Sequence, residues 1–266
     1  MTPAPSRAPR LKKRLGQHHL VNPAVARPLL DFLAPLGGAR VLEVGPGGGQ
    51  LTRELLAAGA RVWAVELDLE WAASLRRLAA SSAHPAALQL LAMDALELPW
   101  GALPPPTLVA GNLPYNVATP LIARVLPQHE RVPRAAFLLQ LEVAQRLVAR
   151  PASRDYGALT VLTAAYAEAR ILGRVRPGSF RPPPKVESAF VGLTLHPPPL
   201  PEPEMRGFLR FVRVAFGQKR KTLRNALGAS LGRDRVEGAV AALGLPPKAR
   251  AEELLLAVWL DLWRKC

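Results

Sequence analysis

The sequence predicts an α/β protein in which a seven-stranded, mostly parallel sheet is followed by a small all-α domain. Between residues 40 and 195, short apolar runs alternate with stretches of helical periodicity. This alternation is typical of a parallel sheet with helices on both faces. A proline-rich stretch then interrupts the chain at residues 197–203, and no strand pattern follows it. The chain has 266 residues, 49% of them hydrophobic, which is enough to build such a core.

The elements follow in order along the chain. The first helix is predicted to begin at Asn22, a good N-cap residue, with Pro23 at the first helical position. Strands are predicted at residues 40–44, 61–65, 88–93, 107–110, 135–139, 169–175 and 187–195. Helices are predicted between them near residues 50–58, 68–80, 119–126, 141–149 and 157–168. Four more are predicted at residues 204–216, 219–231, 235–243 and 251–263.

The proline-rich stretch is the predicted domain boundary, because consecutive prolines form a stiff linker. We expect a sheet domain at residues 15–197, a linker at 198–203 and a helical domain at 204–266. Residues 1–14 carry five basic and no acidic side chains and are predicted to form a flexible basic arm.

The charge balance predicts a polyanionic partner. The chain has 35 Lys and Arg against 20 Asp and Glu, a net charge of +15, which favours binding to nucleic acid. The single cysteine, Cys266, excludes an intramolecular disulfide and a thiolate metal cluster. No apolar run reaches the length of a membrane span, so we expect a cytoplasmic protein with no membrane partner.

Three candidate nucleotide-binding features lie at predicted strand ends. Glycines at 45, 47 and 49 follow the first strand, although Gln50 breaks the dinucleotide-binding pattern. Glu66, after the second strand, is placed to bind ribose hydroxyls, and Asp94, after the third, to accept from an adenine amino group. The alternative is a plain turn with ordinary surface acids. Finding the three together favours a nucleotide site.

Residues 112–115 (Asn-Leu-Pro-Tyr) predict the chemistry. They match the Asn/Asp-Pro-Pro-Tyr type of motif in methyltransferases that act on exocyclic amines. Adenine N6 is a poor nucleophile, because its lone pair is delocalised into the ring. The Asn112 side-chain oxygen and the Leu113 or Pro114 carbonyl can hold its protons, and Tyr115 offers a face on which the base can stack.

Five segments together make the chain resemble the ribosomal RNA adenine dimethyltransferases. They lie at residues 16–20, 41–52, 112–116, 180–188 and 216–225, and the last two are long enough to arise rarely by chance. The resemblance implies a Rossmann-like methyltransferase domain. It also implies S-adenosylmethionine as methyl donor, S-adenosylhomocysteine as product and no metal. The implied acceptors are two adjacent adenosines near the 3′ end of 16S rRNA in the small ribosomal subunit or its precursor. Each would be dimethylated at N6 during ribosome biogenesis, by a monomeric enzyme.

The resemblance also implies site residues. Those implied at the donor are Gln17, His18, Leu20, Gly45, Gly47, Glu66, Leu67, Asp94, Ala95 and Asn112. Those implied at the reacting base are Asn112, Leu113, Pro114 and Tyr115, with Phe180 as a second stacking face. From the charge pattern, RNA phosphates are expected at Arg213, Lys219, Arg220, Lys221 and Arg224, although a solvated basic face is the alternative.

Three residues depart from the family pattern. His18 stands where the family often has Asn, His19 where it usually has Phe, and Leu141 where it often has Lys, so contacts at these positions are open. Two other functions are also open. One is methylation of a single adenine of large-subunit rRNA, which confers antibiotic resistance. The other is a ribosome-assembly or transcription factor built on the same fold.

Overall fold

The computed structural model describes residues 18–80, 85–218 and 221–266. Gln17, Lys219, Arg220 and the basic arm at residues 1–14 therefore lie outside the described residues. The chain forms two compact units. The first comprises the residues up to Ala144 together with Arg170–Leu195, and the second comprises Gln145–Ala169 and His196–Cys266.

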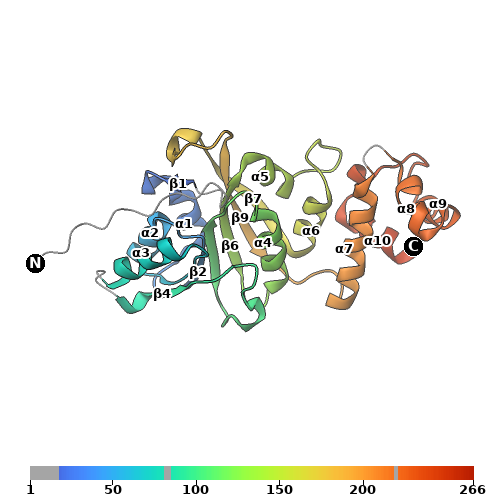
Figure 1. Cartoon of the computed structure of the whole chain (residues 1–266). Coiled ribbons are helices and arrows are strands. Elements are labelled where there is room, and N and C mark those ends of the chain that lie inside the picture. Colours follow the sequence, from blue (N-terminus) through green and yellow to red (C-terminus); the bar gives the residue numbers. More distant parts are fainter. Residues whose placement is uncertain (1–17, 81–84, 219–220) are drawn as a thin grey trace, which may run out of the picture. The chain divides into compact units, whose positions relative to one another are not determined.

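The first unit is built on a seven-stranded sheet in the order β4-β3-β2-β5-β6-β9-β7 (Figure 1). Its strands are β2 (Arg40–Val44), β3 (Arg61–Val65), β4 (Leu88–Leu91), β5 (Leu108–Asn112), β6 (Arg134–Gln140), β7 (Ala167–Val175) and β9 (Ser188–Leu195). The pairs from β4 to β6 are parallel, and β9 is antiparallel to β6. Parallel pairing aligns the carboxyl ends of β2, β3 and β5 along one edge, where open α/β sheets bind ligands.

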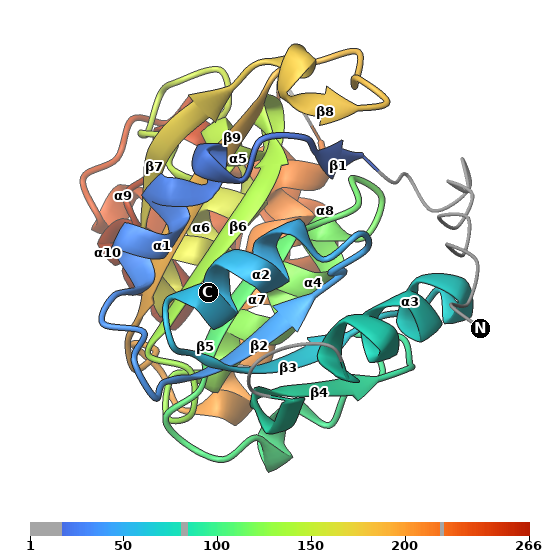
Figure 2. The same ribbon diagram turned by 90° about the vertical axis from the view of Figure 1, so that its left-hand side faces the viewer.

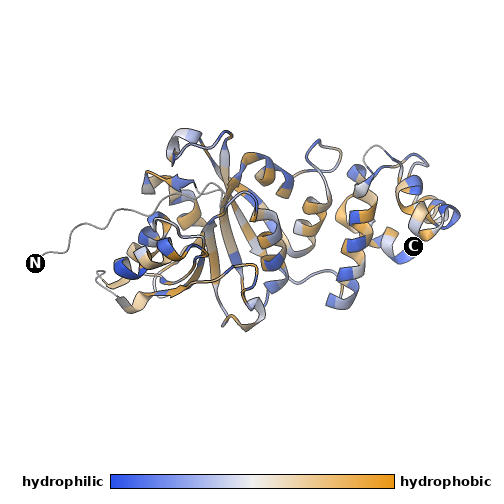
Figure 3. Cartoon of the chain, viewed as in Figure 1, coloured by the Kyte–Doolittle hydropathy of each residue, from blue (hydrophilic) through white to orange (hydrophobic). Residues whose placement is uncertain are grey.

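Helices cover both faces of this sheet. Helices α1 (Arg27–Leu33), α2 (Gln50–Ala57) and α3 (Leu69–Ala80) lie on one face, and α4 (Ala118–Val125) lies on the other (Figures 1 and 2). The strands are mostly hydrophobic, whereas the helices carry both kinds of side chain (Figure 3). Buried leucines and Phe32 of α1 join a core cluster with residues of β2, β3, β6 and β9. Apolar burial of this kind is the main stabilising term of the unit.

The N-terminal helix begins at its predicted N-cap, and it ends before the glycine pair at residues 37 and 38. The Asn22 side chain accepts a hydrogen bond from the Ala24 amide (3.0 Å) and caps a 3-10 helix, Pro23–Ala26, that leads into α1. Helix α1 ends at Leu33. Its end is explained by Pro35, because the residue before a proline, here Ala34, is disfavoured in helical geometry.

A second, two-stranded sheet was not predicted. β1 (His19–Leu20) pairs antiparallel with β8 (Phe180–Arg181), so that His19 lies opposite Arg181 and Leu20 opposite Phe180 (Figure 2). Two-residue strands have no periodicity to reveal them. This sheet joins the start of the described chain to the segment that precedes β9.

The second unit is helical. Its helices are α6 (Ala158–Tyr166), α7 (Glu202–Gly217), α8 (Leu223–Leu231), α9 (Arg233–Ala242) and α10 (Leu256–Lys265). Helix α5 (Leu141–Leu147) spans the division between the units. On α7, buried Met205, Phe208 and Phe211 form an apolar stripe, and Phe211 packs edge-on against Trp259 of α10 with ring centroids 6.0 Å apart.

The two units differ from the domains expected from the sequence. Residues 145–169 belong with the C-terminal helices, although they precede the proline-rich stretch. The reason is the packing of α6, which is apolar and carries Tyr166, whose hydroxyl donates to Glu202 Oε1 of α7 (3.1 Å). Helix α7 also begins at Glu202, so the expected linker overlaps its first turn. No helix in the described parts of the chain is long and apolar enough to cross a membrane.

Candidate active site

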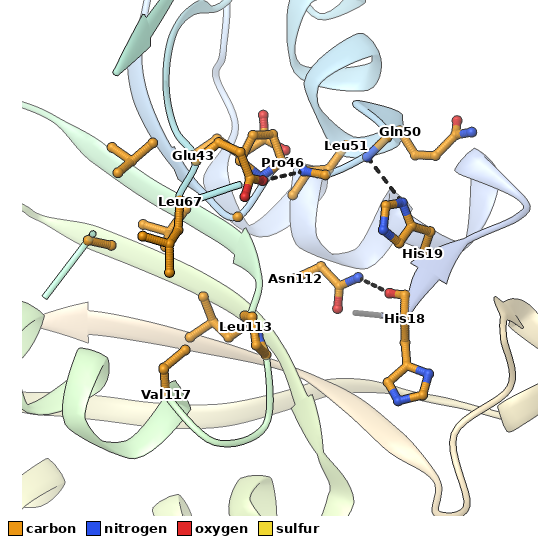
Figure 4. A pocket seen from close by; sticks show the side chains of 18 of the residues that line it. His18, His19, Glu43, Pro46, Gln50, Leu51, Leu67, Asn112, Leu113 and Val117 are labelled. Atoms are coloured by element: carbon orange, nitrogen blue, oxygen red, sulfur yellow. Dashed lines mark hydrogen bonds between the residues drawn. The ribbon is translucent and has the colours of Figure 1, made fainter. Parts of the chain in front are cut away.

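A pocket opens in the first unit at the carboxyl ends of β2, β3 and β5 (Figure 4). Most of the described residues that the sequence analysis assigned to the donor and the base line it. They are His18, Leu20, Gly45, Gly47, Glu66, Leu67, Asp94, Ala95, Asn112, Leu113, Pro114 and Tyr115. They come from five stretches of sequence. The parallel sheet brings four of these to one edge, and the fifth, with His18 and Leu20, lies at the β1–β8 sheet.

The glycine loop and Glu66 form one hydrogen-bonded unit. Gly47 has a positive φ of 51°, a conformation that favours glycine, and its amide donates to Glu66 Oε2 (3.0 Å). The Asp68 amide donates to Glu66 Oε1 (2.9 Å). Each carboxylate oxygen keeps a second acceptor site, so the carboxylate is oriented and can still accept hydroxyl groups. Burial raises the pKa of Glu66, and hydrogen bonds from the backbone of Asp68, Gly47 and Leu67 act in the opposite direction.

Two further acids line the pocket. Asp94 Oδ1 accepts from the Leu96 amide (2.8 Å), which fixes the half-buried carboxylate. Glu43 lies within β2 and is buried, and no described residue hydrogen-bonds to its Oε2. Burial, the largest cause, raises the pKa of Glu43 to about 8. An ammonium group in this pocket would favour the ionised form of Glu43 and would supply a hydrogen-bond donor to Oε2.

Asn112 lies at the end of β5 with its amide oriented. Its Nδ2 donates to the His18 carbonyl oxygen (2.7 Å), as Figure 4 shows. Because a carbonyl can only accept, the amide nitrogen is on that side and Oδ1 points away from it. The close approach of β5 to β2 before this residue requires Gly111, where a Cβ would lie 2.6 Å from the Val44 carbonyl oxygen.

Tyr115 is held at both ends of its side chain. Its hydroxyl lies 3.0 Å from Ser188 Oγ, and its ring stacks on His18 with centroids 5.4 Å apart. His18 in turn donates from Nδ1 to the Pro182 carbonyl oxygen (2.8 Å). Burial raises the pKa of Tyr115, so its hydroxyl stays protonated at neutral pH. The pocket therefore contains an oriented amide and an anchored aromatic ring three positions apart in sequence.

Phe180 is not brought together with these residues. It is the first residue of β8, is buried in the core cluster and does not line the pocket. Pairing of Phe180 with Leu20 in the β1–β8 sheet turns its ring toward the core. The second stacking face that was expected at Phe180 has no support from this placement, and the ring that does face Tyr115 is His18.

The described residues that were expected to contact RNA differ in exposure and in ion pairing. Arg213 on α7 and Lys221 before α8 are exposed. Arg224 is instead paired with Glu237 of α9 at 2.6 Å. Arg224 is therefore partly neutralised, and the unpaired positive charge that the structure describes here lies at Arg213 and Lys221.

Three residues that contact the site were not predicted to have a role. Glu43 and Ser188 lie inside strands, and His19 was noted only as a departure from the family pattern. An acid inside an otherwise apolar strand is a signal that could have identified Glu43, because buried charges are rarely retained without a function. Within the described residues, no group of three or more His, Cys, Asp or Glu side chains could hold a metal ion.

Comparison with known proteins gives one consistent family. A family model described as ribosomal RNA adenine dimethylase matches residues 8–265. Ribosomal RNA small subunit methyltransferase A of Rubrobacter xylanophilus is 43% identical over 100% of this chain and 99% of its own length. The protein of the same name from Acidithiobacillus ferrooxidans is 42% identical over 96% and 94%.

Two solved structures share the fold over almost the whole chain. A dimethyladenosine transferase from Plasmodium falciparum is similar with a TM-score of 0.75 and 22% identity, and the match covers 92% of this chain and 96% of that one. The 23S rRNA methyltransferase ErmE is similar with a TM-score of 0.68 and 29% identity, over 92% and 98%. The match to nearly all of the sequence, and to relatives above 40% identity, shows that the chain belongs to the ribosomal RNA adenine dimethylase family.

Proposed function

We propose that this protein transfers methyl groups from S-adenosylmethionine to N6 of two adjacent adenosines near the 3′ end of 16S rRNA. The observation that carries the proposal is the orientation of Asn112. Its amide nitrogen is engaged by the His18 carbonyl, so Oδ1 remains to accept from an amine. Residues that fix an acceptor in this way are suited to the transition state of N-methylation.

The donor would be held along the glycine loop. Glu66 would bind its ribose hydroxyls and Asp94 its adenine amino group. The unpartnered Glu43 Oε2 would face its α-ammonium group. Leu67, which is 53% exposed, would cover the adenine. When bound, the donor supplies an electrophilic methyl group whose leaving group is a neutral thioether.

The chain's own residues prepare the amine. A base paired in a helix hides its N6, so the target adenine has to be unpaired or flipped out. It would then stack on Tyr115 and place its amino protons toward Asn112 Oδ1 and the Leu113 or Pro114 carbonyl. These acceptors favour a pyramidal, nucleophilic nitrogen. They act most strongly as the new C–N bond forms, after which one amine proton leaves to solvent.

The helical unit is proposed to contribute affinity for RNA. Its residues 204–266 carry 13 basic and 6 acidic side chains, an excess of +7, and Arg213 and Lys221 are exposed. Phosphate contacts of this kind supply most of the binding free energy of nucleic-acid complexes. We propose that one copy of the chain acts alone on the small subunit or its precursor.

A second candidate is methylation of one adenine of large-subunit rRNA, because ErmE has the same fold at 29% identity. The small-subunit assignment is favoured by relatives of that name at 42% and 43% identity. The two are separated by incubating the protein and S-adenosylmethionine with small-subunit particles and, separately, with large-subunit rRNA, and mapping the methylated adenosines by mass spectrometry.

We expect two adjacent dimethylated adenosines in the small-subunit sample and none in the other. A single modified adenine in large-subunit rRNA would favour the second candidate. No methylation in either sample would contradict both.

A further inference from the structure

The imidazole of His19 lies against the glycine loop of the proposed donor site. Pairing of β1 with β8 fixes the backbone of His19. Its Nδ1 accepts a hydrogen bond from the Gly48 amide (3.1 Å), which Figure 4 shows as a dashed line. This is a long-range contact between residues 29 positions apart, so the ring connects the start of the described chain to the loop after β2.

The contact between ring and loop is tight. A Cβ built at Gly47 would lie 2.8 Å from the His19 ring, and one built at Gly48 would lie 2.9 Å from Nδ1. Real Cβ atoms do not approach this closely, so only glycine fits at these two positions while His19 occupies its place. The ring and the two glycines are therefore matched to each other.

The ring also packs on Trp71 of α3. The centroids of His19 and Trp71 are 4.6 Å apart with the planes tilted by 42°. The ring thus contacts both the glycine loop and α3. Because the Gly47 amide also donates to Glu66, the loop is held by Glu66 at one amide and by His19 at the next.

This arrangement requires a neutral imidazole. An amide can donate only to an unprotonated Nδ1, so the neutral ring carries its proton on Nε2. Protonation would place a second donor opposite the Gly48 N–H and remove the hydrogen bond. Burial lowers the pKa of His19, and the positive charge of His18 lowers it further. The neutral form is therefore the one that the fold stabilises.

Charged groups surround the ring on every neighbouring element. His18 directly precedes β1, and Arg181 lies opposite His19 on β8. Arg53 of α2 donates to the carbonyl oxygens of Gly48 and Gly49 (both 3.0 Å). The acids on or next to these elements are Glu54 of α2, Glu66 directly after β3, Asp68 directly before α3 and Glu70 in the first turn of α3. Helix α3 also carries Arg76 and Arg77. Both carboxylate oxygens of Glu66 already accept from backbone amides, and neither of these bonds is to His19.

We propose that His19 is a positioning residue that holds the glycine loop in its donor-binding form only while its imidazole is neutral, so that affinity for the methyl donor falls as the pH falls. The inference rests on the proposed donor site. The sign follows from linkage: a basic group whose neutral form is needed for binding weakens binding as it takes up a proton. The positive charge of S-adenosylmethionine would oppose that proton further.

The test compares the wild type with two variants by calorimetry, using S-adenosylhomocysteine as the probe between about pH 8 and about pH 5. His19→Phe keeps a ring against Trp71 and removes the acceptor. His19→Asn places a carboxamide oxygen near the position of Nδ1 and does not titrate. Other titrating groups, Glu43 included, are common to all three proteins, so the ratio of dissociation constants isolates His19.

We expect the ratio of the wild-type dissociation constant to that of either variant to be constant above pH 6.5, the ordinary histidine value. Below the pKa of His19, which burial holds under that value, the ratio should rise with a limiting slope of about tenfold per pH unit, as for one linked proton. Thermal unfolding shows whether each variant is folded. If the His19→Phe variant does not fold, the comparison of wild type with His19→Asn alone decides the outcome.

A ratio that stays constant over the whole pH range would overturn the proposal, because His19 would then not be linked to donor binding. Failure of the probe to bind all three proteins even at about pH 8 would instead contradict the donor site itself. The two failures are therefore distinguishable.

Discussion

The pocket of the first unit and the basic surface of the second are built in opposite ways. In the pocket, each key side chain is fixed by a specific partner: Asn112 by the His18 carbonyl, Tyr115 by Ser188 and Glu66 by two amides. On the helical unit, the exposed cations Arg213 and Lys221 stand without an ion-pair partner among the described residues, whereas Arg224 pairs with Glu237.

The difference reflects two physical tasks. A transition state is stabilised by groups whose orientation is fixed before the reaction, so an error of about 1 Å can cost about 100-fold in rate. Phosphate attraction depends mainly on the number of charges, and it tolerates mobile side chains. Substitutions in the pocket should therefore change rate or donor affinity sharply, and substitutions on the helical unit should change RNA affinity gradually.

The largest effect is expected for Asn112→Ala. Removing an oriented acceptor from the reacting nitrogen should lower the rate of methyl transfer by about 10²–10³, by analogy with the loss of one electrostatic group at an active site. The measurement is a single-turnover assay with donor and RNA both saturating. An unchanged rate would mean that Asn112 does not touch the reacting amine.

Glu66→Ala should have the next largest effect, on donor binding. It leaves ribose hydroxyls unpaired and also removes the acceptor of the Gly47 and Asp68 amides. We expect a loss of about 1–3 kcal/mol in binding of S-adenosylmethionine by calorimetry. Asp94→Ala should lose less, because Asp94 Oδ1 holds only one amide, that of Leu96. Equal affinity in wild type and both variants would remove the donor assignment.

Tyr115 separates stacking from hydrogen bonding. Tyr115→Ala should lose about 1–3 kcal/mol of base stacking and slow the reaction. Tyr115→Phe keeps the ring and loses only the bond to Ser188, so it should remain largely active. Kinetics of both variants at several RNA concentrations test this. A Phe variant as impaired as the Ala variant would assign the role of Tyr115 to its hydroxyl.

The smallest effect is expected on the helical unit. Replacing Lys219, Arg220 and Lys221 by Ala should flatten the dependence of log K for RNA on log salt by roughly 2, at about 0.7–0.9 per phosphate contact. The matched control exchanges Lys and Arg at the same three positions and keeps the charge, so its slope should equal that of the wild type. A slope unaffected by the Ala variant would make this stretch a solvated face.

The sequence analysis predicted the main sheet well, because each strand is an apolar run bounded by turn residues. β2 and β3 lie at the predicted residues, and the other strands of the sheet differ by one or two residues at one or both ends. It also predicted which residues gather at the sheet edge, since parallel topology fixes where strand ends meet.

What the sequence could not predict depends on side-chain direction and on contacts distant in sequence. Nothing in the segment around Phe180 shows that pairing with β1 turns its ring into the core. The sequence also does not show that the His18 ring stacks on Tyr115 or that Arg224 pairs with Glu237. The association of residues 145–169 with the C-terminal helices depends on the packing of α6, which a proline-rich stretch elsewhere cannot reveal.

The central claim is that the pocket carries out the chemistry while the helical unit supplies affinity for RNA. Its most direct test is a side-by-side measurement of the single-turnover rate at saturating RNA and of the RNA dissociation constant, for Asn112→Ala and for the triple Ala variant of residues 219–221. We predict that Asn112→Ala loses rate with unchanged RNA affinity, and that the triple variant loses affinity with an unchanged rate. A triple variant that stays slow at saturating RNA, or an Asn112→Ala protein that transfers methyl at the wild-type rate, would contradict this division of tasks.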